Sequence, residues 1–156
     1  MNETPVAAST TRGVAPWHLW AVGILSLLWT CYGAYDYTMS HVGGLEFFQS
    51  MGFDEEVFAW FQAIPAWATA AWAVGVWVSL LGAVLLLARS RHAATAFLVS
   101  LVGAAASFAY QFTSDRPASL EGFGNTVMPV VILIVIALQW YYARRRAAGR
   151  SRPSSG

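Results

Sequence analysis

The sequence predicts an all-α membrane protein: a four-transmembrane-helix bundle with a short interfacial helix between spans 1 and 2. Four apolar segments are long enough for this fold, because about 20 helical residues cover a hydrocarbon core of roughly 30 Å. The composition agrees, since 57% of the residues are hydrophobic and 11% are charged, against about a quarter charged in a soluble domain. The arginines also cluster at positions that such a bundle would place on one side of the membrane.

The first span is predicted over residues 16–37, after a small and polar segment, 1–15, that predicts a disordered tail. The apolar run is too long for the core of a signal peptide, which is about 7–15 residues, so we expect a retained helix. Rings typical of interfacial aromatic belts stand at both ends of this span: Trp17, Trp20, Tyr35 and Tyr37.

A long connection follows, and residues 54–64 predict the interfacial helix. Asp54 is a suitable N-cap, and Glu55 and Glu56 occupy the first turn, where the helix dipole favours acids. Pro65 then either ends this helix or kinks one long helix that continues through the second span.

The remaining spans are predicted over residues 66–88, 93–112 and 126–143, the last with Pro129 in its first turn. Small side chains line one face of the second and third spans, and such faces let membrane helices approach closely. We expect these residues to mediate helix packing, either within the bundle or in a homo-oligomer: Ala71, Gly75, Ser79, Ala83, Ser100, Gly103 and Ser107.

The charges predict the orientation. Arg12, Arg89 and Arg91 share one side of a four-span bundle with the basic tail 144–156, while the opposite side carries most of the acids. The positive-inside rule then places both termini in the cytoplasm. Within the tail, we expect three consecutive basic residues to bind lipid headgroups: Arg144, Arg145 and Arg146.

The first span also carries the candidate ligand-binding site. Helical spacing puts Trp29, Tyr32, Gly33 and Asp36 on one face, and ionisable groups inside a membrane are often functional. In an antiparallel bundle Tyr110 and Gln111 end at a similar depth. These six residues predict an outward-facing pocket for a polar or cationic solute. The alternative is that Asp36 simply lies among the headgroups, where a charge costs little.

Other classes of function are excluded by what the sequence lacks. It has no Ser-His-Asp grouping, metal-ligand cluster or glycine-rich phosphate loop, so we expect no enzyme, no cofactor and no metal. It also lacks a basic aromatic surface outside the C-terminal tail, which argues against nucleic-acid binding.

Several stretches resemble a known family: residues 17–29 (WHLWAVGILSLLW), 33–39 (GAYDYTM), 63–77 (AIPAWATAAWAVGVW), 85–93 (LLLARSRHA) and 96–112 (AFLVSLVGA, then YQF). The chain is similar there to small four-span inner-membrane proteins of bacteria that are often labelled sugar transporters. The resemblance implies a bacterial inner-membrane location and a role in transport or binding of small solutes, sugars among them, but no residue role. The alternative is a structural or accessory membrane subunit. Membrane lipids are the expected partners.

A pair of reporters tests the topology. We expect a fluorescent protein fused after Gly156 or before Met1 to fluoresce, and alkaline phosphatase at either place to be inactive, because both termini are predicted to be cytoplasmic. The measurement is whole-cell fluorescence and phosphatase activity. Opposite results at the two ends would mean an odd number of spans and would contradict the four-span prediction.

Overall fold

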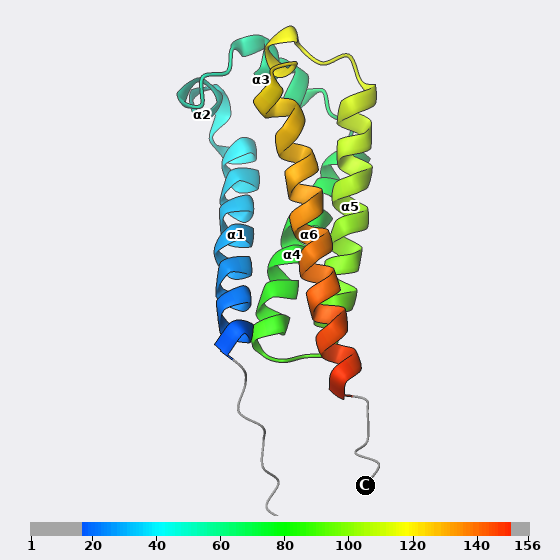
Figure 1. Cartoon of the computed structure of the whole chain (residues 1–156). Coiled ribbons are helices and arrows are strands. Elements are labelled where there is room, and N and C mark those ends of the chain that lie inside the picture. Colours follow the sequence, from blue (N-terminus) through cyan, green and yellow to red (C-terminus); the bar gives the residue numbers. More distant parts are fainter. Residues whose placement is uncertain (1–16, 151–156) are drawn as a thin grey trace, which may run out of the picture.

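The computed structural model describes residues 17–150, which form six α-helices, one short 3-10 helix and no strand (Figure 1). The predicted tail 1–15 and the end of the basic tail, residues 151–156, lie outside the described residues. The elements are α1 (Trp17–Val42), α2 (Gly44–Ser50), α3 (Glu55–Gln62), α4 (Ala66–Leu87), α5 (Ala93–Thr113), η1 (Ala118–Leu120) and α6 (Phe123–Arg150).

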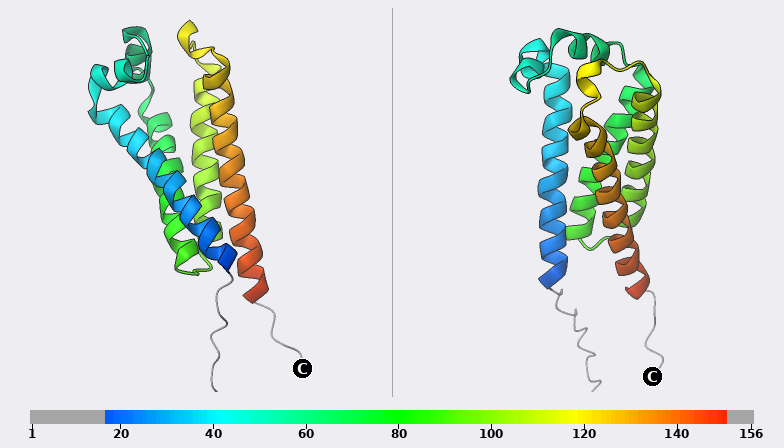
Figure 2. Two further views of the ribbon diagram at one scale, coloured as in Figure 1. Left: turned by 60° about the vertical axis from the view of Figure 1, so that its left-hand side comes forward. Right: turned by 45° about the horizontal axis from the view of Figure 1, so that its top comes forward.

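Four long helices, α1, α4, α5 and α6, lie side by side, and α2 and α3 cover one end of them (Figure 1). Helix α4 packs against both α1 and α5, and α6 packs on α5. The α1–α4 pair diverges from the α5–α6 pair toward the end that carries α2 and α3 (Figure 2). The four helices therefore pack in the order α1, α4, α5, α6, and α1 and α6 make little contact with each other.

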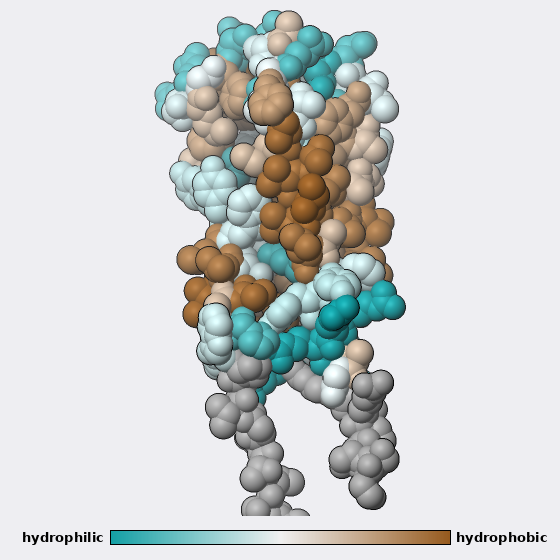
Figure 3. Space-filling view, in the orientation of Figure 1, coloured by the Kyte–Doolittle hydropathy of each residue, from teal (hydrophilic) through white to brown (hydrophobic). Residues whose placement is uncertain are grey.

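Three of the described helices are long and apolar enough to cross a membrane: α4, α5 and residues Phe123–Gly149 of α6. A hydrophobic band separates two hydrophilic ends on the face seen in Figure 3. Helix α1 is of similar length, but it carries Trp, Tyr, His and Asp side chains and is not one of the three. The structure thus shows a helical, membrane-type protein with three candidate spans, which is one fewer than the sequence predicts.

The connection after α1 contains two helices, whereas the sequence predicts one over residues 54–64. The predicted one corresponds to α3, and Asp54 caps it as expected, its Oδ1 accepting a hydrogen bond from the Val57 amide at 3.0 Å. The other, α2, begins at Gly44, which takes a left-handed φ of +58° that suits glycine. Pro65 has an extended ψ of 146° just before α4, so the chain breaks there and α3 and α4 are separate.

Two of the long helices extend beyond their predicted bounds. Helix α1 passes residue 37 and ends at Val42, and in this extension Thr38 Oγ1 donates a hydrogen bond to Ala34 O at 2.7 Å. Helix α6 begins at Phe123, so Pro129 lies inside the helix instead of in its first turn. It also continues through the arginine cluster to Arg150, since alanine and arginine are strong helix formers and nothing stops the helix at Ala143.

Helices α4 and α5 meet through their small residues. A Cβ added to Gly103 would lie 2.8 Å from the Ala71 carbonyl oxygen, and one added to Gly75 would lie 3.0 Å from the Ala104 amide nitrogen. The buried Ser100 hydroxyl donates a hydrogen bond to the Gly75 carbonyl across this contact. The two small-residue faces therefore pack on each other within one chain.

Glycine substitutions test this interface. We expect Gly103→Ala to destabilise the fold by about 1–3 kcal/mol, because a methyl group would be forced against a backbone oxygen. Gly33→Ala is the matched control, since a Cβ there meets no atom within 4 Å and alanine favours helix by about 0.5–1 kcal/mol. Thermal unfolding in detergent, followed by tryptophan fluorescence, measures both. Equal midpoints for the two variants would contradict the close α4–α5 approach.

Candidate functional site

The candidate residues of α1 lie along one uncovered flank of that helix. Trp29 is 36% exposed and Tyr32 is 66% exposed, while Gly33 and Asp36 are half-buried. The Gly33 backbone faces open space, since an added Cβ would touch nothing within 4 Å. Among the described residues none donates a hydrogen bond to the Asp36 carboxylate or pairs with it. The flank therefore presents one unpartnered acid beside exposed rings.

The other two candidate residues, Tyr110 and Gln111, lie near the end of α5 and are engaged locally. The Tyr110 ring packs edge-on against Trp67 of α4, with 5.4 Å between ring centroids. The Gln111 amide nitrogen donates to Ser107 Oγ at 3.2 Å. Helix α4 packs between α1 and α5, so the structure does not bring these two side chains onto Asp36. The sequence placed both sets at a similar depth, but depth alone does not determine which helices are neighbours.

An aromatic cluster next to Asp36 fixes the orientation of α1 at this end. Tyr37 packs edge-on against Trp72 of α4 at 4.9 Å, and both rings lie close to His41, at 4.4 and 5.6 Å. Phe61 of α3 joins them, 5.5 Å from Trp72. Edge-on contacts of this kind stabilise ring pairs. Because successive helical residues are about 100° apart, holding Tyr37 on α4 turns Asp36 away from α4 and toward the uncovered flank.

At the other end of the bundle, a polar cluster joins the first turn of α1 to the C-terminal part of α6. Tyr142 Oη lies 3.0 Å from His18 Nδ1 and accepts hydrogen bonds from Arg146 Nε and Nη2 at 3.3 and 3.1 Å. This cluster is not among the sites predicted above, although the sequence carries a signal for it. Three aromatic residues at 140–142 precede three arginines at 144–146 by four positions, the spacing of neighbours on a helix face.

A buried polar layer crosses the middle of the bundle. Gly23 of α1 lies close to Leu87 of α4, and Gly82 of α4 lies close to Phe97 of α5. In these antiparallel helix pairs Thr30, Ser79 and Ser100 therefore lie at one depth, and all three side chains are buried. Ala143 shares a core cluster with Phe97, which puts Gln139, one turn earlier in α6, at the same depth. Gln139 is 5% exposed, and no described residue donates a hydrogen bond to its Oε1. The sequence pattern hid this layer because three of its four members are small hydroxyl residues.

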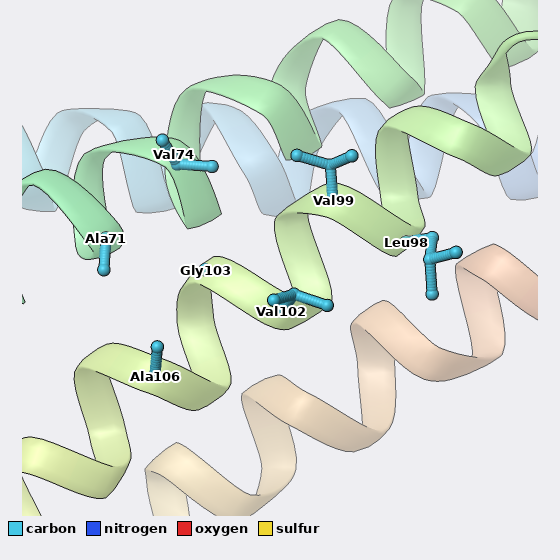
Figure 4. A pocket seen from close by; sticks show the side chains of 7 residues that line it. All are labelled: Ala71, Val74, Leu98, Val99, Val102, Gly103 and Ala106. Atoms are coloured by element: carbon cyan, nitrogen blue, oxygen red, sulfur yellow. The ribbon is translucent and has the colours of Figure 1, made fainter.

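Other kinds of site find no support in residues 17–150. No group of three or more His, Cys, Asp or Glu side chains could hold a metal ion among them. A groove between α4 and α5 is apolar throughout and suits lipid better than a polar solute (Figure 4). Its lining consists of Ala71, Val74, Leu98, Val99, Val102, Gly103 and Ala106.

No protein-family model, curated protein or solved structure matches this chain. The assignment of a site therefore rests on the residues themselves.

Substitution of Gln139 tests whether the buried layer is purely structural. We expect Gln139→Met to leave the fold as stable as before or up to about 1–3 kcal/mol more stable, because it removes a buried acceptor without a donor and keeps a similar shape. Thermal midpoints in detergent measure the change. A clear loss of stability would instead mean that the amide oxygen is satisfied by a bound molecule.

Proposed function

We propose that this chain is a small-solute binding or transport protein of the bacterial inner membrane, with both termini in the cytoplasm. In this proposal α1 is the fourth span and its flank binds the solute. The observation that carries it is Asp36: a half-buried carboxylate with no partner among residues 17–150, next to open space at Gly33.

The packing of α1 supports its assignment as a span. It runs antiparallel to α4, an apolar candidate span, from the contact of Gly23 with Leu87 to that of Tyr37 with Trp72. A helix that follows a spanning helix over this length lies within the same layer of lipid. Its 26 residues, at about 1.5 Å each, also exceed a hydrocarbon core of roughly 30 Å.

The chemistry of the flank favours a solute that carries hydroxyl or ammonium groups. A carboxylate accepts hydrogen bonds at both oxygens, and such bonds are stronger where water is scarce. The exposed rings of Trp29 and Tyr32 offer apolar faces against which a sugar ring or a cation can pack. Asp36 thus supplies polarity, and the rings supply contact area.

An accessory subunit is the second candidate, and a different observation favours it. Large apolar side chains of α1, Leu25 and Leu28, are exposed, and α1 and α6 do not pack along their lengths. A transmembrane helix of another protein could occupy that side. In this case Asp36 would be a contact residue and the chain would carry no solute.

Substitution of Asp36 in proteoliposomes separates the two. We expect wild-type protein to take up or retain a labelled solute from a panel of sugars and organic cations, and Asp36→Asn to reduce this about tenfold or more, the size of one lost charge-assisted hydrogen bond. Glu46→Gln, which alters an exposed acid on α2, is the matched control and should behave as wild type. No uptake by wild type, together with co-purification of a larger membrane protein, would replace this proposal with the accessory role.

A further inference from the structure

We propose that the ends of α1 and α6 form a phosphate-binding site at the arginine-rich end of the bundle. Its ligand is a phosphate group, carried by an anionic lipid headgroup or free in solution. The site consists of His18, Tyr142 and Arg146, residues that stand at opposite ends of the sequence.

The three side chains converge on one point. Arg146 Nη2 lies 2.9 Å from His18 Nδ1 and 3.1 Å from Tyr142 Oη, and these last two atoms are 3.0 Å apart. A guanidinium has five N–H donors, so those not aimed at the ring and the phenol remain for another acceptor. The contact between Tyr142 Oη and His18 Nδ1 uses one hydrogen, from either the phenol or the ring, and the O–H or N–H that it does not use can be donated to the same acceptor. Phosphate oxygens fit such a set, because the planar guanidinium fork matches phosphate geometry.

The positive charge of the arginines at this end favours binding of an anion. In the part of the chain that the structure describes, no carboxylate forms an ion pair with Arg144, Arg145 or Arg146. The described acids lie in the outer part of α1, in α2 and α3, and in the loop after α5, all toward the opposite end of the bundle (Figure 1). Residues 17–150 thus supply no acid at this end, and the membrane surface and the solution are the large sources of negative charge outside them.

The arginines are also held against aromatic rings of the kind that occupy membrane interfaces. Each guanidinium packs over the ring four residues earlier: Arg144 over Trp140 at 5.4 Å, Arg145 over Tyr141 at 4.8 Å and Arg146 over Tyr142 at 5.4 Å. Helical side chains tilt toward the N-terminus, and α6 runs out of the hydrophobic band toward this end. The arginines therefore reach back to the level of the interfacial aromatic residues. Of the three, Arg146 alone also forms a hydrogen bond with α1, through His18, so it is the arginine that belongs to the proposed site.

The experiment places full-length protein in phosphatidylcholine nanodiscs, in the same nanodiscs with added phosphatidylglycerol, and in phosphatidylcholine nanodiscs with inorganic phosphate. Lipid retention by native mass spectrometry and the thermal midpoint are measured in each. We expect phosphatidylglycerol to be retained and to raise the midpoint of wild type. Arg146→Gln should bind it about tenfold more weakly, as for one lost charge-assisted hydrogen bond. Arg146→Lys, which keeps the charge and loses the fork, should fall in between.

Arg144→Gln is the matched control, since it removes the same charge from a residue that does not contact α1. It should lose only the part of the phosphatidylglycerol effect that comes from the general attraction of headgroups to charge, which is a smaller loss than in Arg146→Gln, and the phosphatidylcholine arm verifies that each variant is folded. A midpoint shift by inorganic phosphate that Arg146→Gln abolishes supports the site and assigns its ligand to solution. Equal losses in the two glutamine variants, or no effect of either ligand on wild type, would overturn the proposal. Asp36→Asn should leave these measurements unchanged, so this result is independent of the solute-binding test.

Discussion

The close approach of α4 and α5 is the constraint on which the rest of the structure depends. Lipid offers no hydrophobic driving force for joining helices, so van der Waals contact and interhelical hydrogen bonds must supply it. Gly75 and Gly103 remove the side chains that would hold the backbones apart, and the Ser100 hydroxyl bonds across the gap. With this pair fixed, α1 packs on the outer side of α4 and α6 on α5. The order of the helices then leaves the α1–α6 side with the fewest contacts.

That order explains how much of the fold the sequence could predict. The lengths and apolar character of α4, α5 and α6 follow from runs of Val, Leu, Ile and Ala, and the Asp54 cap follows from a local preference that the surrounding structure does not oppose. Helix α2 could not be anticipated, because its seven residues carry no clear periodicity. The sequence predicts a span that ends before the arginine cluster, but α6 continues through it to Arg150 because Arg and Ala extend helices well.

The candidate site was only partly predictable for the same reason. Helical spacing alone predicts that Trp29, Gly33 and Asp36 share one flank of α1, since that periodicity is local. It could not reveal that α4 lies between this flank and Gln111, because neighbour relations in a bundle depend on which faces pack. The contact of His18 with Arg146 was equally invisible, since the two residues are 128 positions apart. Only the regular spacing of aromatic residues and arginines in α6 hinted at it.

The contact between the two ends of the chain also bears on how the protein is made. Helix α1 is the first described element to leave the ribosome, but the side chains that hold its beginning, Tyr142 and Arg146, belong to the last. At translation rates of about 5–20 residues per second, the 124 positions between His18 and Tyr142 correspond to a delay on the order of ten seconds. During that interval these contacts do not yet hold the beginning of α1. Formation of α1 and completion of the bundle are therefore separate events in the biogenesis of this protein.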